Sequence, residues 1–212
     1  MKTESFLSSR LWRYATKRFD PNQIVAEEQL HLILESIRLT PTSYGLQPFK
    51  VIVVKNSNLR EHLRSAGFNQ PQFTEASHLL AFAHYDGFSE DLIDRYIKLT
   101  IEIRQADPLK IEGYRSFLKH LFGAWSNEQK AHWADKQMYL ALGSALQAAA
   151  ELKVDSCALE GFETEKANRI LGLTDKQLKV TAFLALGYRS QEDAAQHLSK
   201  IRVPYSDLVE II

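Results

Sequence analysis

The stretch RLTPTSYGLQPFKVIVV, residues 38–54, leads from the end of an expected helix through a polar loop into an apolar run. Apolar residues at helical spacing predict a helix over residues 27–40. Residues 49–54 are too few for a core helix, so they predict a fully buried strand. Two prolines bracket the small and polar residues between these elements. The loop therefore either only connects a helix to a strand or also holds a ligand.

Apolar patterning extends along the rest of the chain. Helices are predicted over residues 3–11, 58–66, 89–105, 111–122, 126–152 and 163–171. Further strands are predicted over residues 79–85, 155–159 and 178–187. Helices outnumber strands, and the strands lie far apart in the sequence. We therefore expect a layered α+β domain in which helices flank a central mixed β-sheet.

The longest predicted helix begins with SNEQ, residues 126–129, a Ser-x-x-Gln capping box. From Met138 onward it is apolar on nearly every face. Such a helix has to be covered all round, by its own core on one side and by a partner subunit on another. Gly172 is a suitable residue to close the following helix. The apolar tail VPYSDLVEII, residues 203–212, is expected to add a strand to a neighbouring sheet, in this chain or in a second one.

Composition indicates one soluble domain over residues 1–212. The chain is 45% hydrophobic, which supplies a core without a metal or a disulfide. Its 26 basic and 26 acidic residues cancel, so no overall field favours nucleic acid or an anionic membrane. Cys157 is the only cysteine; it fits a reducing cytoplasm and is expected to be buried and inert. The N-terminal residues lack the apolar core of a secretory signal, and residues 138–152 are too few to span a bilayer.

Several common sites have no matching motif. No Gly-x-Gly-x-x-Gly or Walker sequence follows a predicted strand, so a nucleotide would have to be held in another way. No Gly-x-Ser-x-Gly elbow is present, and the seven histidines show no metal-ligand spacing. Hydrolase and metalloenzyme functions therefore have little support.

Two basic segments are candidates for an anion site. RLWRYATKRF, residues 10–19, carries Arg13, Lys17 and Arg18 beside aromatic residues. In LSKIRVP, residues 198–204, Lys200 and Arg202 alternate with apolar residues, which places both charges on one side of an extended segment. Each segment is either a solvated surface or half of a phosphate site, since Arg offers phosphate a planar fork and Lys a compact charge.

Two further segments offer backbone and amide groups. In LEGF, Gly161 follows Glu160 between a strand and a helix, which is either an ordinary turn or a place where backbone approaches a flat ligand. In FNQPQFTEASH, Asn69, Gln70 and Gln72 gather amides around a proline. Amides in a loop are common, but they can also bind the donor and acceptor edge of a heterocycle.

Taken in order, WRYATKRFD, PTSYGLQPF, NQPQ with ASH, KQMYLALG, LEGF and KIRVP resemble the motifs of the nitroreductase family of FMN-dependent oxidoreductases. The resemblance implies a three-layer fold with a long buried helix at a dimer interface. It implies a homodimer in which both chains hold each FMN. It also implies a ping-pong reaction, in which NADH or NADPH gives a hydride to the flavin and a small-molecule acceptor, such as a nitroaromatic or a quinone, then takes the electrons.

The resemblance also assigns roles to individual residues. Arg13, Lys200 and Arg202 match phosphate-binding positions, and Asn69 matches the amide at the pyrimidine edge. Lys17 and Glu160 are the expected catalytic-site residues: Lys17 would stabilise the charge of the reduced flavin, and the Glu160 turn would approach N5 and O4. The expected cofactor contacts are Arg13, Tyr14, Ala15, Lys17, Pro41, Thr42, Ser43, Gly45, Gln47, Asn69, Gln72, Leu159, Glu160, Gly161, Lys200 and Arg202. Of these, Thr42, Ser43 and Gly45 would enter the partner's flavin site.

Some positions depart from the family pattern. Ala15 stands where many members have Ser, and Gln72 stands where some carry Lys. Tyr44 and Gly45 replace a Thr-Asn pair, which alters the expected substrate pocket. Tyr44, Phe68 and Phe117 are the expected substrate contacts. Tyr114 and Phe122 are alternative gating aromatics on the same predicted helix as Phe117.

Three other functions compete with this one. The same flavin could reduce a pteridine or an enone, with nitro reduction only incidental. The chain could instead be a flavin-binding sensor without turnover, or a structural α+β dimer without a cofactor. Flavin absorbance and its loss on adding NADH or NADPH would separate these functions.

Overall fold

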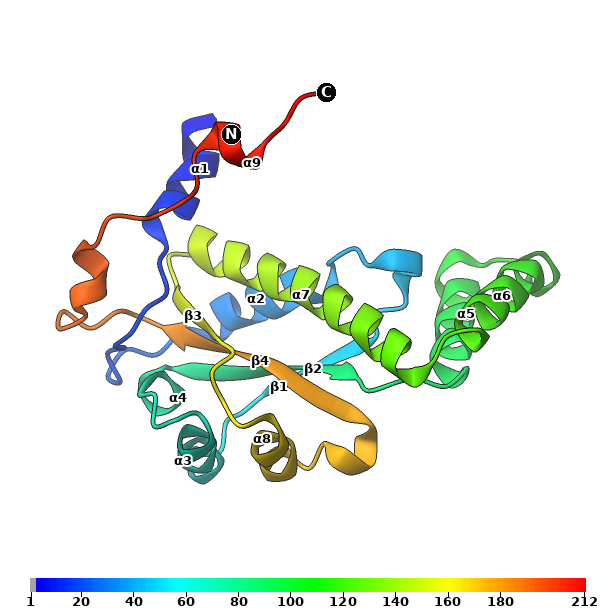
Figure 1. Cartoon of the computed structure of the whole chain (residues 1–212), viewed down its shortest axis with the longest axis horizontal. Helices are drawn as coiled ribbons and strands as arrows, with labels where there is room; N and C mark the ends of the chain where they lie inside the picture. Colours follow the sequence, from blue (N-terminus) through cyan, green and yellow to red (C-terminus); the bar gives the residue numbers. More distant parts are fainter. Residues whose placement is uncertain (1–2) are drawn as a thin grey trace.

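The structure is a computed structural model that describes residues 3–212 (Figure 1). Within the described residues, its centre is a four-stranded sheet in the order β1-β2-β4-β3. The strands are β1 (Phe49–Val53), β2 (His78–Tyr85), β3 (Asp155–Leu159) and β4 (Leu178–Gly187). All four agree with the predicted apolar runs to within one residue at each end.

The sheet is antiparallel, so the prediction of a mixed sheet was wrong for the described part of the chain. The β1–β2, β2–β4 and β3–β4 pairs all run antiparallel. A parallel pairing occurs only locally in this part, as an isolated bridge between Ala15 and Ser156. Strand direction depends on the path of the chain between strands, which apolar patterning does not encode.

Helices cover both faces of the sheet, which confirms the layered α+β fold (Figure 1). On one face lie α2 (Glu27–Arg38) and α7 (Asn127–Glu151). On the other lie α3 (Ser57–Ala66), α4 (Gln72–Glu75) and α8 (Thr164–Leu171). The single turn of α4 was not predicted because it is too short to show a period.

Alternate strand residues face two separate cores. Phe82 of β2 packs with Ile33 of α2 and Met138 of α7, and all three are buried. On the opposite face Phe183 of β4 makes edge contacts with Phe73 at 5.1 Å. Burying each such side chain stabilises the fold by about 1.5–3 kcal/mol, so these two cores fix the register of the sheet.

The long helix α7 begins as predicted. The Ser126 hydroxyl accepts from the Gln129 N–H, and the Gln129 side chain accepts from the Ser126 N–H. One flank of the helix is buried, including Met138 and Ala145, but Leu140 on the opposite flank is 52% exposed. A single chain therefore does not cover this helix all round.

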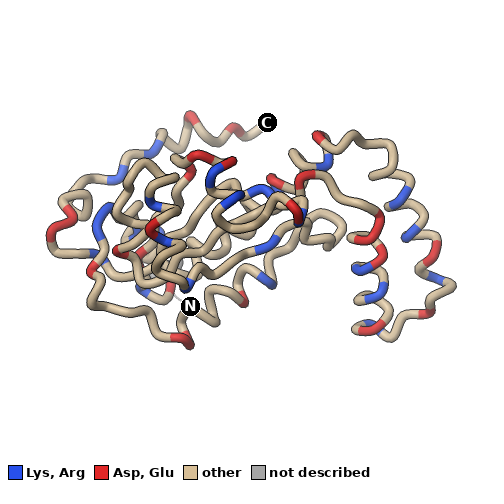
Figure 2. The backbone as a smooth tube through the Cα atoms, turned by 90° about the horizontal axis from the view of Figure 1, so that it is seen from below, with Lys and Arg blue, Asp and Glu red and all other residues tan. Residues whose placement is uncertain are grey.

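A helical hairpin stands away from the sheet at one end of the molecule (Figures 1 and 2). It consists of α5 (Asp91–Arg104) and α6 (Pro108–Gly123), which share a small core with Leu46 and Phe88. Helix α6 begins three residues earlier than predicted because the Asp107 carboxylate caps the Leu109 N–H and Pro108 takes the first helical position.

The remaining elements are short or terminal. Helix α1 (Thr3–Trp12) contacts α7, and Gly172 ends α8 in the left-handed conformation, as predicted. Helix α2 ends two residues earlier than expected because the Thr40 hydroxyl donates back to the Ser36 carbonyl. The tail forms α9 (Tyr205–Leu208) and no strand within this chain, so its addition to a second chain stays a prediction. The 3-10 turns are η1 (Ser43–Gly45), η2 (Thr174–Lys176) and η3 (Ala194–His197).

Candidate functional site

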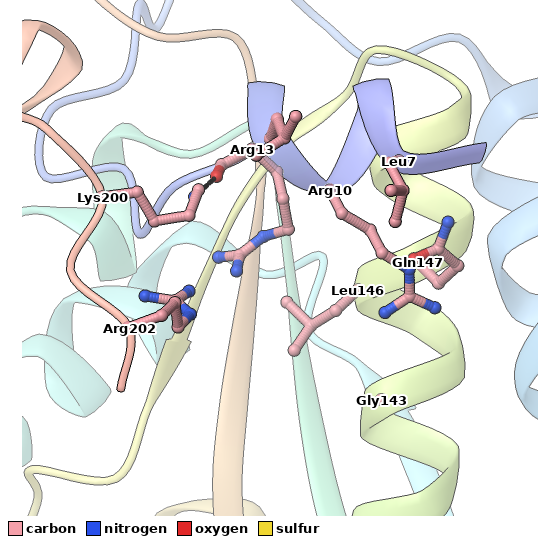
Figure 3. Close-up of a pocket in the computed structure, with 9 residues that line it drawn as sticks. Leu7, Arg10, Arg13, Gly143, Leu146, Gln147, Lys200 and Arg202 are labelled. Atoms are coloured by element: carbon pink, nitrogen blue, oxygen red, sulfur yellow. Dashed lines mark hydrogen bonds between the residues drawn. The ribbon is translucent and has the colours of Figure 1, made fainter. Parts of the chain in front are cut away.

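Four cations from opposite ends of the chain, Arg10, Arg13, Lys200 and Arg202, meet beside α7. Arg13 follows α1, whereas Lys200 and Arg202 lie on the extended segment after η3. They line a cavity of about 460 Å³ together with Gly143 and Gln147 of α7. Figure 3 shows the guanidinium groups of Arg13 and Arg202 pointing toward the same space, while Lys200 Nζ donates to the Arg13 carbonyl. The two basic segments found in the sequence therefore form one cluster.

The electrostatics of this cavity favour an anion. Burial lowers the pKa of the Arg13 guanidinium, and the charge of Arg202 lowers it further. The pKa of the Lys200 amine is lowered by burial and then by Arg13 and Arg202. Among the described residues, no carboxylate lines the cavity, and Arg13 Nε is buried without a hydrogen-bond partner. A phosphate would relieve this repulsion and satisfy the buried donor.

Asp193 anchors the segments that carry these cations, and no motif in the sequence pointed to it. Its carboxylate is 1% exposed and accepts from the Tyr14 hydroxyl at 2.8 Å. It also accepts from the N–H groups of Lys17, Arg18 and Ala195 at 2.8, 3.3 and 3.0 Å. Burial of the carboxylate would raise its pKa, but these hydrogen bonds outweigh it and lower the pKa. The Tyr14 hydroxyl is thus used inside the protein.

A turn of exposed backbone lies at the end of β3. Leu159 is buried, while Glu160 and Gly161 are exposed. The Tyr139 hydroxyl on α7 donates to Glu160 Oε1 at 2.9 Å, and Gln70 Nε2 donates to the Gly161 carbonyl at 2.7 Å. Gln70 is therefore a structural contact of the turn, and its amide hydrogens are not available to read a ligand edge.

The remaining predicted amides lie near this turn and near the cations. Asn69 is exposed, adopts the left-handed conformation and directly precedes Gln70. Gln72 is 4% exposed, and its Oε1 has no hydrogen-bond partner. Thr16 Oγ1 and Ser156 Oγ are also buried without a partner. Ser156 lies on β3, the Thr16 N–H donates to the Ser156 carbonyl, and the Gln72 side chain contacts Cys157 of β3. The three unpaired atoms therefore indicate a polar site along this strand.

Strand β3 connects the two ends of this site. Ser156, near its start, bridges to Ala15 beside the cations, and Glu160 follows its last residue. Four residues of extended chain separate these points, about 13 Å. The site therefore suits a ligand with a phosphate at one end and a flat heterocycle at the other.

The loop over residues 41–47 lies elsewhere in the chain. Its polar groups are largely used within the protein: Gln47 Nε2 donates to the Arg38 carbonyl, and the Gln47 N–H donates to Thr42 Oγ1. The Ser43 N–H donates to Gln137 Oε1 on α7 at 2.9 Å. Pro41 at the start of this loop is exposed. The loop is thus a fixed turn on the α6 side of the molecule.

An aromatic surface adjoins this loop. The Tyr44 ring, held at φ 59°, lies 6.3 Å from Phe117 and 5.8 Å from Phe122 of α6. Tyr114 stacks on Phe117 at 6.3 Å with an interplanar angle of 20°. Phe117 is 50% exposed, whereas Phe122 is 1% exposed and belongs to the core. Of the three aromatic gating candidates on α6, Phe122 is therefore excluded as a surface contact.

One chain does not bring all predicted site residues together. Ser43 contacts α7 at Gln137, but the cation cavity contacts α7 between Gly143 and Gln147. The nearer end of the cavity is six residues from Gln137, about 9 Å along the helix. Phe68, 66% exposed, lies with Asn69 and the turn after β3, away from the α6 aromatics. The site therefore divides into a cation and turn half and an aromatic loop half.

A model of the Nitroreductase family matches residues 11–188. The chain belongs to the nitroreductase family. Its sequence is 38% identical over 206 residues to the "Putative NAD(P)H nitroreductase YfkO" of Bacillus subtilis (strain 168), with 91% of each chain covered. A Staphylococcus epidermidis protein with the same type of name is 33% identical over 209 residues, covering 95% of this chain and 94% of that protein.

Solved structures of family members share the fold. The crystal structure of ydfN from Bacillus subtilis matches with a TM-score of 0.89 at 19% identity, covering both chains completely. A structure from Exiguobacterium sibiricum 255-15, described as a "putative nitroreductase in complex with FMN", matches with a TM-score of 0.82 at 17% identity. It covers 100% of this chain and 98% of that one. This similarity confirms the nitroreductase-like fold.

The described residues contain neither a metal-binding group nor a membrane-spanning helix. No group of three or more His, Cys, Asp or Glu side chains in this part could hold a metal ion. None of its helices is both long and apolar enough to cross a bilayer. Cys157 is buried as predicted, and burial raises the pKa of its thiol.

Proposed function

We propose that this chain is an FMN-dependent NAD(P)H oxidoreductase of nitroreductase type, with residues 1–212 as a single FMN-binding domain. The observation that carries the proposal is the alignment of the site along β3, with Arg13, Lys200 and Arg202 at one end and the Glu160–Gly161 turn at the other. Arg13 Nε and Gln72 Oε1 are buried without a partner, so they supply a donor and an acceptor that such a ligand would satisfy.

Each group has a definite task in this site. Arg13, Lys200 and Arg202 would hold the phosphate, which carries roughly −1.5 to −2 charges at neutral pH. Asn69 and Gln72 would bind the heterocycle edge through their amides. When bound, FMN supplies the chemistry of accepting a hydride from NADH or NADPH and passing the electrons to an acceptor. Lys17, whose side chain is exposed, would stabilise the negative charge that reduction places on the ring.

The second half of the site is assigned to a partner chain. Residues 41–47, with the α6 aromatics beside Tyr44, contact α7 at Gln137, about 9 Å along the helix from the nearer end of the cation cavity, so they do not line that cavity in one chain. A second copy would cover the exposed flank of α7 at Leu140, Ile201 just before the tail, and Ile211 in the tail. We therefore infer a cytoplasmic homodimer, in which Tyr44 and Phe117 of each chain form a wall of the other chain's substrate pocket.

Flavin content and reduction test this function. Purified protein, reconstituted with FMN, is expected to be yellow and to contain equimolar FMN. Anaerobic NADH or NADPH should bleach the flavin, and a nitroaromatic or a quinone should restore the colour. A colourless protein that FMN does not stabilise would contradict the proposal. A flavin that neither donor bleaches would favour a sensor, and reoxidation by an enone or a pteridine alone would favour the alternative reductases.

Oligomeric state is a separate test. Light scattering at the mass of one chain would contradict the shared site. A dimer that dissociates when residues 205–212 are removed would support the assignment of the tail to the partner.

A further inference from the structure

The turn after β3 is anchored on both sides of Gly161. Phe162 is 8% exposed, and its ring contacts Phe183 at 4.9 Å between centroids. The Glu163 N–H donates to the Ala66 carbonyl at 2.9 Å. On the other side, Leu159 pairs with Phe183 of β4, and the Tyr139 hydroxyl donates to Glu160 Oε1. Gly161 is the exposed residue between these two anchored sides. Exposed backbone next to a glycine has many accessible conformations unless another group holds it.

Gln70 is the group that holds Gly161. Its Nε2 donates to the Gly161 carbonyl at 2.7 Å and to the Gly67 carbonyl at 3.0 Å. Both partners are acceptors, so the NH2 end of the amide must face them. Both amide hydrogens are therefore used, and the side chain links two loops that lie 91 residues apart in the sequence.

The loop that carries Gln70 is itself well fixed. Phe68 and Asn69 adopt the left-handed conformation, with φ 54° and 59°. The Asn69 N–H donates to the Arg64 carbonyl, and the Gln70 N–H donates to the Gly67 carbonyl. A Cβ on Gly67 would lie 2.2 Å from the Phe73 ring, so the loop packs closely on α4. A fixed loop makes Gln70 a suitable anchor for the turn.

The carbonyl and the N–H of Gly161 differ in their use. The Gly161 carbonyl is taken by Gln70, whereas the Gly161 N–H donates to no acceptor in the described part of the chain. Asn69, the neighbour of Gln70, presents a second exposed polar side chain. Gln70 therefore fixes the position of the Gly161 N–H relative to the Asn69 side chain.

We propose that Gln70 is a positioning residue that holds the Glu160–Gly161 turn in register with Asn69, so that both contact the same edge region of the bound flavin. This inference rests on the proposed function. It assigns Gln70 no contact with the flavin, because its amide hydrogens face protein carbonyls. The contact between the turn and the flavin then depends on a side chain outside the ligand site.

Two substitutions of Gln70 test the role. Q70L removes the donor, and we expect it to raise the FMN dissociation constant by about three- to tenfold, the effect of one hydrogen bond. It should also lower the midpoint potential of the bound flavin, because a misplaced turn N–H no longer stabilises the reduced ring. Q70E keeps the shape but points a carboxylate at two carbonyl oxygens. Its FMN affinity should recover between about pH 8 and pH 5, because a protonated carboxyl can again donate.

The matched control is Q191E, which makes the same change at an exposed glutamine. Its affinity and potential should follow those of the wild type at every pH. The FMN phosphate also titrates in this range, so each affinity is compared with that of the wild type at the same pH. If Q70L does not fold, the ratio of the Q70E affinity to the wild-type affinity at the two pH values still decides the question. Gln70 variants that melt earlier but keep the wild-type FMN affinity and potential would overturn the inference alone. A wild type that binds no FMN would overturn the proposed function, and the inference with it.

Discussion

The Tyr139 hydroxyl donates a hydrogen bond of 2.9 Å to Glu160 Oε1 and so ties the turn after β3 to the middle of α7. Burial of the hydroxyl raises the pKa of Tyr139, and the hydrogen bond to Glu160 raises it further. The phenol therefore stays a donor across the physiological range. The carboxylate that it holds belongs to the turn assigned to the flavin edge.

The variant Y139F tests this contact by deleting one oxygen. We expect the free energy of unfolding to fall by about 1 kcal/mol or less, since the hydrogen bond is partly exposed. We also expect the potential of the bound flavin to fall, because the Glu160 charge is no longer shared with a donor and opposes the charge of the reduced ring. Denaturant unfolding and a potentiometric titration measure the two effects.

Tyr188 supplies the control for Y139F. Its hydroxyl donates to Gln29 Oε1 at 3.0 Å, away from the turn. Y188F should cost similar stability and leave the potential unchanged. Equal potentials in both variants and the wild type would show that the Tyr139 contact is only structural.

Asp193 gives a prediction for pH dependence. D193N removes the charge that receives hydrogen bonds from Tyr14, Lys17, Arg18 and Ala195. The free energy of unfolding at pH 7 should fall by about 3 kcal/mol, which is the scale of a buried network of hydrogen bonds to a charged group. Because the folded-state pKa of Asp193 is lowered, its contribution is fully present above about pH 4 and is lost as the pH falls through the folded pKa.

Urea unfolding at neutral and acid pH checks this sign. The difference in the free energy of unfolding between the wild type and D193N should shrink below about pH 4. The exposed Asp175 offers the matched variant D175N, which should leave stability unchanged at both pH values. A gap that grows on acidification would contradict the assignment.

Local signals in the sequence predicted the four strands and the longer helices, but not the contacts between them. The Ser126–Gln129 box and Gly172 encode helix ends by themselves, and buried strands follow from short apolar runs. The antiparallel order of the sheet joins strands that are distant in the sequence, such as β2 and β4, so no local pattern contains it.

In the candidate site too, residue types were evident from the sequence, whereas the contacts between residues were not. The chemistry of Arg13, Lys200 and Arg202 was evident from residue type, but their convergence needed the fold. Gln70 looked like a ligand amide, yet a carbonyl 91 residues away takes its donor. Asp193 and Tyr139 were missed because an isolated Asp or Tyr carries no signal until its partner is known. A search of the sequence for Asp and Glu residues that could accept hydrogen bonds from loop N–H groups would have returned Asp193 among many other carboxylates.

Lys17 tests the electrostatic role proposed for the flavin edge. Its side chain is exposed, so K17Q should change the stability of the ligand-free protein little. FMN affinity should fall by about tenfold, and the midpoint potential should fall as well, since a cation near the reduced ring is lost. K176Q, at an exposed lysine in η2, is the control. An unchanged potential in K17Q would contradict the role assigned to Lys17.

Phe117 and Phe122 separate substrate recognition from folding on the same helix. Phe117 is 50% exposed and lies against Tyr44 and Tyr114, whereas Phe122 is 1% exposed. F117A should leave the free energy of unfolding nearly unchanged but raise KM for flat aromatic acceptors by about three- to tenfold, because a stacking surface is lost. F122A should instead cost about 3–5 kcal/mol of stability. Steady-state kinetics with a nitroaromatic and with a small non-aromatic acceptor, alongside unfolding curves, would measure both; equal effects of F117A on the two acceptors would contradict a stacking role.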